Sequence, residues 1–269
     1  MKMILALLGM LSVSVSFIGC SKSSNENNIT TPVEAKKPEL TYPDSVFYIT
    51  SSQDYIVGPV GQSSGTYFSF PEGLSLNEKT GAINVSKSDA GLKYRVSFVE
   101  NGKSDTASTF ILISGINYMD GFYNLAKGDS ILKPVYNANK DIAIPGINNG
   151  TTFDVGLNCN KLGCKVSTAT AEINLAQTVR NGVFGNTPSN NDRHEFDLTY
   201  RINDNSLKFD NTLKVKLYFF NSMSEVTPEA FDIIASRQGT IIGPGNTTSA
   251  ALAKKAARPR PPCIFIVSH

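Results

Sequence analysis

The sequence has no tryptophan, only two histidines and few charged residues, and these shortages narrow the function classes. Charged residues make up 18% of the chain, with 25 Lys and Arg against 23 Asp and Glu, so we expect no nucleic-acid partner. With so few histidines and no CxxC or HxxxH pair, we expect no metal site and no cofactor. The sequence also lacks a Walker phosphate loop and an HExxH helix, which favours a non-catalytic protein.

Long apolar runs are also scarce, and the longest is at the start of the chain. Residues 3–19 carry no charge and follow the positive Lys2, which is the form of a secretory signal. A bilayer core needs about 20 apolar residues, whereas this run is interrupted by Gly9 and several serines, so a spanning helix is the weaker interpretation. We predict a signal peptide over residues 1–19.

The run ends in Phe17-Ile18-Gly19-Cys20, which resembles the lipobox of bacterial lipoproteins, with Phe where the usual first residue is Leu. The resemblance implies cleavage before Cys20 and diacylglycerol on its sulfur, so that a lipid anchor holds the protein to a membrane. Residues 20–39 are polar and predict a flexible tether. We expect a cell-envelope location at the outer membrane, and the periplasmic and surface faces both stay open.

Three cysteines follow the tether. Because an exported protein meets an oxidising compartment, and only four residues separate Cys159 from Cys164, these two are the candidate disulfide. Cys263 is then left without a predicted disulfide partner.

Residues 40–114 are rich in short strand patterns. Residues 93–98 alternate, with Tyr94, Val96 and Phe98 on one face, and Asn101-Gly102 before the run at 109–113 predicts a hairpin. Residues 70–77 (FPEGLSLN) and 79–83 (KTGAI) resemble the signature of bacterial immunoglobulin-like and cadherin-like domains. The resemblance implies an immunoglobulin-like β-sandwich over 40–114, without the calcium ligands of true cadherins. The whole layout is similar to that of uncharacterised Bacteroidota lipoproteins.

Residues 115–269 predict a second β-rich domain of unknown topology. The alternating runs 195–202 and 213–219 predict an antiparallel pair, and residues 263–267 predict a buried strand. Thr227-Pro228 before an apolar stretch predicts one short helix, with Thr227 as its N-cap. The expected fold class is therefore all-β: a sandwich followed by a β-rich domain with one short helix.

Two groups of residues are candidate sites. Tyr118, Phe122 and Tyr123 could form an aromatic platform for a sugar, although packing between domains is the commoner use of such rings. Glu195 and Asp197 lie on one strand face about 7 Å apart, a spacing compatible with glycosidic chemistry but common in exposed strands. The leading hypothesis is a non-catalytic envelope lipoprotein that binds or presents a protein or glycan partner. The alternatives are a polysaccharide-acting hydrolase and a structural component of envelope assembly.

Overall fold

The structure is a computed structural model that describes residues 39–61, 64–237 and 261–269. Residues 37–269 form one compact unit, and most of its regular structure is β-strand. The fold is therefore all-β, as predicted. Within the described ranges, no helix is both long enough and apolar enough to cross a bilayer.

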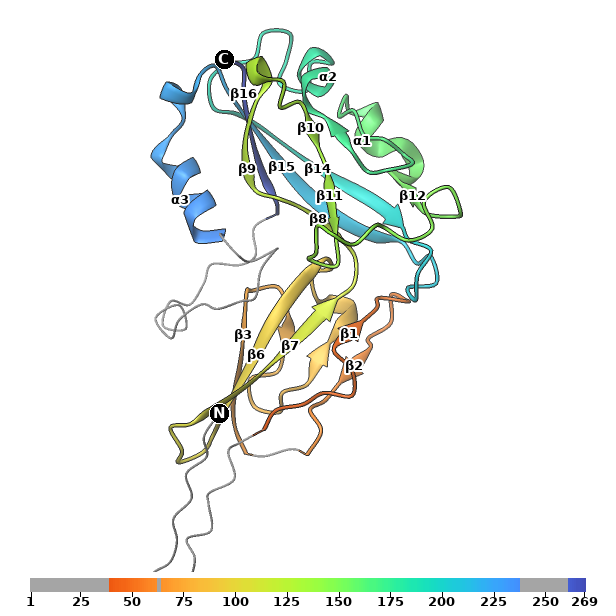
Figure 1. Ribbon diagram of the computed structural model, residues 1–269, viewed down its shortest axis with the longest axis vertical. Coiled ribbons are helices and arrows are strands. Elements are labelled where there is room, and N and C mark those ends of the chain that lie inside the picture. Colours follow the sequence, from red (N-terminus) through yellow and green to blue (C-terminus); the bar gives the residue numbers. More distant parts are fainter. Residues whose placement is uncertain (1–38, 62–63, 238–260) are drawn as a thin grey trace, which may run out of the picture. The chain divides into compact units, whose positions relative to one another are not determined.

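The first half of the described chain forms two sheets around one core, and we call it the first sandwich (Figure 1). The sheets have the orders β1-β7-β6-β3 and β2-β5-β4. In an immunoglobulin-like sandwich the third, sixth and seventh strands share one sheet, and the second, fifth and fourth share the other, as here. The strands are β1 (Val46–Phe47), β2 (Ile56–Val57), β3 (Gly65–Phe70), β4 (Ser75–Leu76), β5 (Ile83–Asn84), β6 (Leu92–Glu100) and β7 (Thr106–Ile113).

The predicted hairpin is confirmed in β6 and β7, which pair antiparallel from Leu92↔Ile113 to Val99↔Thr106. Tyr94, Val96 and Phe98 are buried on one face of β6 because alternate side chains of a strand point the same way. The turn contains Gly102 at φ 75°, a conformation that glycine adopts without steric cost.

The second sandwich, as we call residues 116–269, has a five-stranded sheet of order β12-β14-β15-β16-β9 and two short pairs, β10-β13 and β11-β8. The predicted antiparallel pair is confirmed in β14 and β15. The strands are β8 (Ile116–Tyr118), β9 (Gly121–Asn124), β10 (Ile131–Leu132), β11 (Pro134–Tyr136), β12 (Thr152–Phe153), β13 (Ile173–Asn174), β14 (Asp192–Arg201), β15 (Asn211–Phe220) and β16 (Cys263–Val267).

The predicted helix is α3 (Pro228–Arg237), which packs Ala230 and Ile233 against Phe265 and its neighbours. Two shorter helices accompany it, α1 (Asn158–Lys161) and α2 (Leu175–Arg180). Neither is long enough to give a helical period in the sequence. Single turns of 3-10 helix are η1 (Val85–Lys87), η2 (Leu125–Lys127), η3 (Val155–Leu157) and η4 (Met223–Glu225).

The second sandwich repeats a buried contact of the first. The Tyr42 hydroxyl donates to the carbonyl oxygen of Gly81 at 2.6 Å, and the Tyr118 hydroxyl donates to that of Ala171, also at 2.6 Å. Gly81 and Ala171 both have positive φ, 70° and 60°, in the tight turn before β5 and before β13. The same turn is therefore fixed in the same way in both sandwiches.

Backbone pairing repeats as well. Val85 N donates to Tyr55 O at 2.8 Å, and Leu175 N donates to Ser130 O at 2.8 Å, so β2-β5 corresponds to β10-β13. A bridge from Val166 to β13 takes the place of β4, and β12-β14-β15 takes the place of β3-β6-β7. The second sandwich thus has the strand order of the first, which gives it an immunoglobulin-like topology too.

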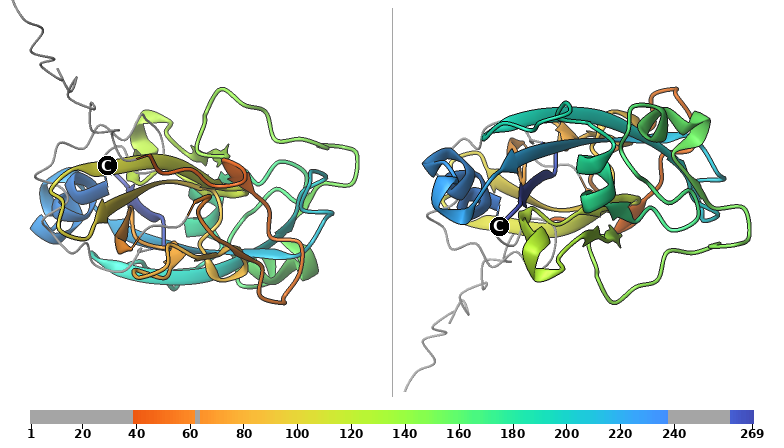
Figure 2. Two further views of the ribbon diagram at one scale, coloured as in Figure 1. Left: turned by 90° about the horizontal axis from the view of Figure 1, so that it is seen from below. Right: turned by 90° about the horizontal axis from the view of Figure 1, so that it is seen from above.

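One strand breaks the repeat. In the first sandwich β1 pairs directly with β7 in parallel, whereas in the second β9 is separated from β15 by β16, which is parallel to both. Figures 1 and 2 show β16 in dark blue beside β15. β16 is therefore an additional strand with no counterpart in the first sandwich.

Candidate functional site

The predicted lipidation site, Cys20, and the predicted signal peptide lie outside the described residues, as does nearly all of the tether. The lipid anchor stays a prediction from the sequence.

The predicted disulfide between Cys159 and Cys164 is not present in the structure, where both residues are buried free thiols. Cys159 is the second residue of α1. Its backbone N donates to the buried Asp154 carboxylate at 2.8 Å, and its sulfur donates to the Asp197 carbonyl at 3.4 Å. Burial raises the pKa of the Cys164 thiol to about 12, and burial also raises that of Cys159. Both thiols are therefore protonated and unreactive at neutral pH.

The three rings of the predicted aromatic platform are not brought together. Tyr118 is completely buried, with its hydroxyl bonded to Ala171 O. Tyr123 packs against the same core as Tyr118, whereas its neighbour Phe122 packs on the other face of the sheet, against Phe265 and α3. Consecutive strand residues point to opposite faces, so these residues pack within the fold instead of sharing a binding surface.

The candidate acid and base are each paired with a lysine. Lys216 Nζ contacts Glu195 Oε1 at 2.7 Å, and Lys214 Nζ contacts Asp197 Oδ1 at 2.9 Å, across the β14-β15 pair. The hydrogen bond from Lys216 lowers the pKa of Glu195. A general acid needs a raised pKa, so the geometry opposes the glycosidase hypothesis. The described residues also contain no group of three His, Cys, Asp or Glu side chains that could hold a metal ion.

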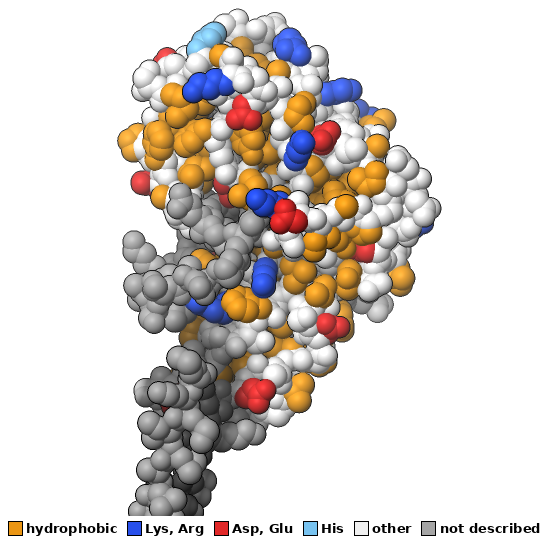
Figure 3. Space-filling model, viewed as in Figure 1, with side chains coloured by type: hydrophobic (Ala, Val, Ile, Leu, Met, Phe, Trp, Pro, Cys, Tyr) orange, Lys and Arg blue, Asp and Glu red, His pale blue; other side chains and the backbone are white. Residues whose placement is uncertain are grey.

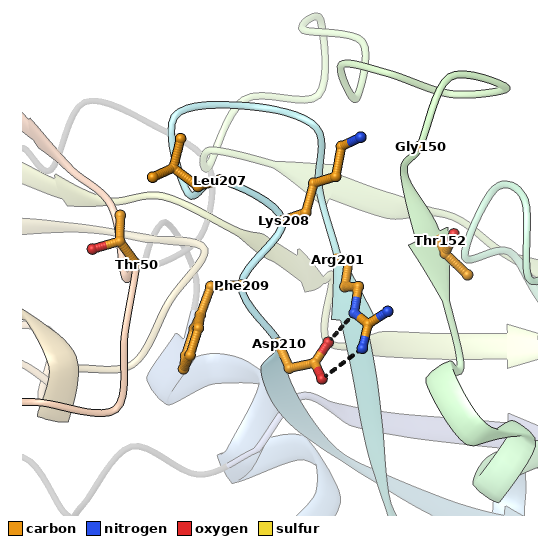
Figure 4. A pocket seen from close by; sticks show the side chains of 8 residues that line it. All are labelled: Thr50, Gly150, Thr152, Arg201, Leu207, Lys208, Phe209 and Asp210. Atoms are coloured by element: carbon orange, nitrogen blue, oxygen red, sulfur yellow. Dashed lines mark hydrogen bonds and ion pairs between the residues drawn. The ribbon is translucent and has the colours of Figure 1, made fainter.

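An open pocket of about 450 Å³ lies where the loop between β14 and β15 approaches the start of β12 (Figure 4). Arg201, at the end of β14, makes a two-bond ion pair with Asp210. Thr152 lies on β12, and Thr50 of the first sandwich completes one side. The pocket therefore offers hydroxyls and a neutralised ion pair to a ligand. Its lining residues are Thr50, Gly150, Thr152, Arg201, Leu207, Lys208, Phe209 and Asp210.

The loop at the pocket holds two consecutive residues in the left-handed conformation. Leu207 has φ 56° and Lys208 has φ 59°, and neither is glycine. Leu207 is 78% exposed, the most exposed large apolar residue described. The Lys208 side chain passes over Gly150, where a Cβ would lie 2.5 Å from its ammonium. Within residues 39–61, 64–237 and 261–269, no carboxylate forms an ion pair with Lys208. Figure 4 shows Leu207 and Lys208 pointing to opposite sides of the loop.

Partly buried hydrogen bonds hold the base of this loop. The Tyr136 hydroxyl donates to Asp204 Oδ2 at 2.7 Å, and the Ser114 hydroxyl donates to Asn137 Oδ1 at 2.9 Å and lies 3.3 Å from Asp204 Oδ2. Burial raises the pKa of Tyr136, so its hydroxyl stays a donor at neutral pH. Phe209 packs against the core of the first sandwich. The loop is thus rigid at its base and strained at its tip. Sequence reasoning missed this loop, because Ser114 and Tyr136, the partners of Asp204, lie far away in the chain.

Charge does not gather at any one part of the face shown in Figure 3, where single Lys, Arg, Asp and Glu side chains are scattered among apolar ones. This agrees with the near-equal count of 25 basic and 23 acidic residues in the chain. That face therefore has no charged patch that would attract a partner of opposite charge.

No family model matches the chain, and no curated protein matches it. Among solved structures, the chain is similar to the crystal structure of human protocadherin-24 EC1-2, with 10% identity over 67% of this chain and 94% of that chain. The TM-score is 0.23, which is too low for this similarity to support a conclusion about the protein. The immunoglobulin-like topology described above depends on the strand order alone.

Proposed function

We propose that the protein is a non-catalytic lipoprotein of the bacterial cell envelope that binds a protein or glycan partner. Lipid on Cys20 anchors it at the outer membrane, and residues 20–39 tether the folded part. The lipobox resemblance and the resemblance to Bacteroidota lipoproteins support this location. Immunoglobulin-like domains carry many functions, so the proposal for binding depends on the site and not on the fold.

The observation that carries the binding proposal is the exposed Leu207 in a strained loop beside a pocket. Left-handed backbone costs a non-glycine residue about 1–2 kcal/mol, and such strain gathers at functional sites. A large apolar side chain that is 78% exposed adds an unfavourable contact with water. A partner that covers Leu207 and pairs with Lys208 would remove that apolar contact with water and satisfy the ammonium.

The other candidate residues are less suited to binding a partner than this loop is. Tyr118 is inaccessible, and Glu195 and Asp197 are paired with lysines. The pocket contains polar groups with apolar Leu207 at its edge, a combination suited to a glycan or a peptide.

Binding of residues 37–269 to purified envelope proteins and to polysaccharide arrays tests the proposal. Leu207→Asn keeps a residue that tolerates the left-handed conformation but removes the apolar side chain. Leu157→Asn is the matched control, because Leu157 is also left-handed, with φ 58°, and 48% exposed, but lies next to α1. We expect Leu207→Asn to weaken binding at least tenfold and Leu157→Asn to leave it unchanged. Equal binding by both variants, or no ligand for the folded wild type, would contradict the proposal.

A further inference from the structure

The additional strand β16 fills a slot that the first sandwich does not have. There, Val46↔Leu112 and Phe47↔Ile113 join β1 directly to β7. In the second sandwich the corresponding strands, β9 and β15, are held apart by one strand width, and β16 lies between them. The seven-strand topology is complete without β16, so β16 is a strand added to the domain.

The slot is apolar on both sides. Every residue of β16 has 0% exposure. Ile264 and Ile266 enter the main core of the second sandwich, while Cys263, Phe265 and Val267 pack on the other face with α3. Without a strand in the slot, β9 and β15 would present unpaired edges and both cores would be open to water.

The contacts that β16 makes with the described residues on either side of it are non-covalent. Backbone pairing runs from Lys216↔Cys263 to Phe220↔Val267 on one side and from Ile264↔Gly121 on the other. The Cys263 backbone N also donates to Asp120 Oδ1 at 2.6 Å. The same bonds would form whichever copy of the chain supplied the strand.

A long segment of chain precedes β16. Residues 238–260 join α3 to β16 and lie outside the described residues. These 23 residues could reach at most about 80 Å if fully extended. Such a length allows the strand to enter the slot of a neighbouring molecule, and exchange of an identical element is a low-cost way to form an assembly.

We propose that the slot between β9 and β15 takes Cys263–Val267 from a second copy of this chain, so that copies assemble by strand exchange. Confinement of the protein to a membrane surface would raise its local concentration and favour exchange over closure within one copy. This inference rests on the proposed lipid anchor for the raised local concentration, but it does not use Leu207 or the pocket, so strand exchange and binding at Leu207 can fail separately.

Disulfide trapping in the full-length chain tests the exchange. One copy carries Gly121→Cys and the other Ile264→Cys, with different affinity tags, and the two are co-expressed. The two positions are direct register partners, and a Cβ at Gly121 meets only ordinary contacts at 3.5 Å or more. Both copies also carry Cys263→Ser, whose hydroxyl can replace the thiol as donor to Pro261 O. We expect a disulfide-linked product that contains both tags after mild oxidation.

The control places both cysteines in one chain, where closure within a copy gives an intramolecular disulfide and the product stays a monomer. A disulfide in that control together with no two-tag product would overturn the proposal. A second measurement uses no substitutions: light scattering of the wild-type chain, refolded at low and at high concentration. Exchange predicts dimers or larger species at high concentration that persist on dilution, and a monomer under all conditions would overturn it.

Discussion

The repeated tyrosine contact gives a sharp prediction of stability. Tyr118 is completely buried, and its hydroxyl donates to Ala171 O at 2.6 Å. Tyr118→Phe keeps the ring but leaves that carbonyl without its donor, at a cost of about 1–3 kcal/mol. A loss of about 2 kcal/mol lowers the Tm by about 4–8 °C in a unit of this size. Tyr42→Phe should cost less, since Tyr42 is 9% exposed and water can replace the hydroxyl.

Thermal and urea unfolding of residues 37–269 would measure both variants. Tyr55→Phe is the control, because Tyr55 is 42% exposed and its change should stay within about 0.5 kcal/mol. Burial raises the pKa of Tyr118 well above 10.0 in the folded state. The stabilisation is therefore fully present below pH 10 and is lost as the pH rises further, and the loss should be smaller in Tyr118→Phe. If Tyr118→Phe behaved like Tyr55→Phe, the assignment of this contact as a structural anchor would be refuted.

Three further predictions concern the folded unit. Gly81→Ala should lower the free energy of unfolding by about 2–4 kcal/mol, since the new Cβ would lie 2.6 Å from the Tyr67 ring at a φ of 70°; an unchanged urea midpoint would contradict this. Glu195→Gln should cost less than about 1 kcal/mol, because Glu195 is exposed to solvent in its pair with the half-buried Lys216. The lowered pKa of Glu195 means that this small stabilisation is present above pH 4.5 and lost at lower pH, so the variant should show a weaker acid dependence in urea titrations. Alkylation mapped by mass spectrometry should label both core thiols only after unfolding, and a linked peptide would show the structure wrong about Cys159 and Cys164.

Short-range signals predicted the local elements well. Asn101-Gly102 fixed the β6-β7 hairpin, and Thr227-Pro228 marked the start of α3. The alternation predicted for 195–202 is also confirmed at its start, where Glu195 is exposed and Phe196 is buried in β14. These features depend on neighbours within a few residues, which the sequence displays directly.

Long-range pairing was not predictable. The run at 263–267 was predicted as a strand, but its slot depends on partners such as Gly121, which lies 143 positions before Ile264. The aromatic platform was not found for the same reason: Tyr118 is buried, and Ala171, which accepts its hydrogen bond, lies 53 positions away in the chain.

The repeat was hidden by divergence at the turn. Residues 80–84 read TGAIN and residues 170–174 read TAEIN, with Ala171 where the first copy has glycine. Since Ala at positive φ is uncommon, the second turn lacks the glycine that marks the first. The two segments share Thr, Ile and Asn, and the matched hydrogen bonds of Tyr42 and Tyr118 show that the two turns correspond.

Mass spectrometry of the mature N-terminal peptide tests the central claim most directly. The protein would be expressed from its full-length sequence in a bacterium that processes lipoproteins. The account predicts that the mature chain starts at Cys20 with diacylglycerol on its sulfur. An unmodified Cys20, or a chain that still begins at Met1, would contradict the envelope lipoprotein proposed here.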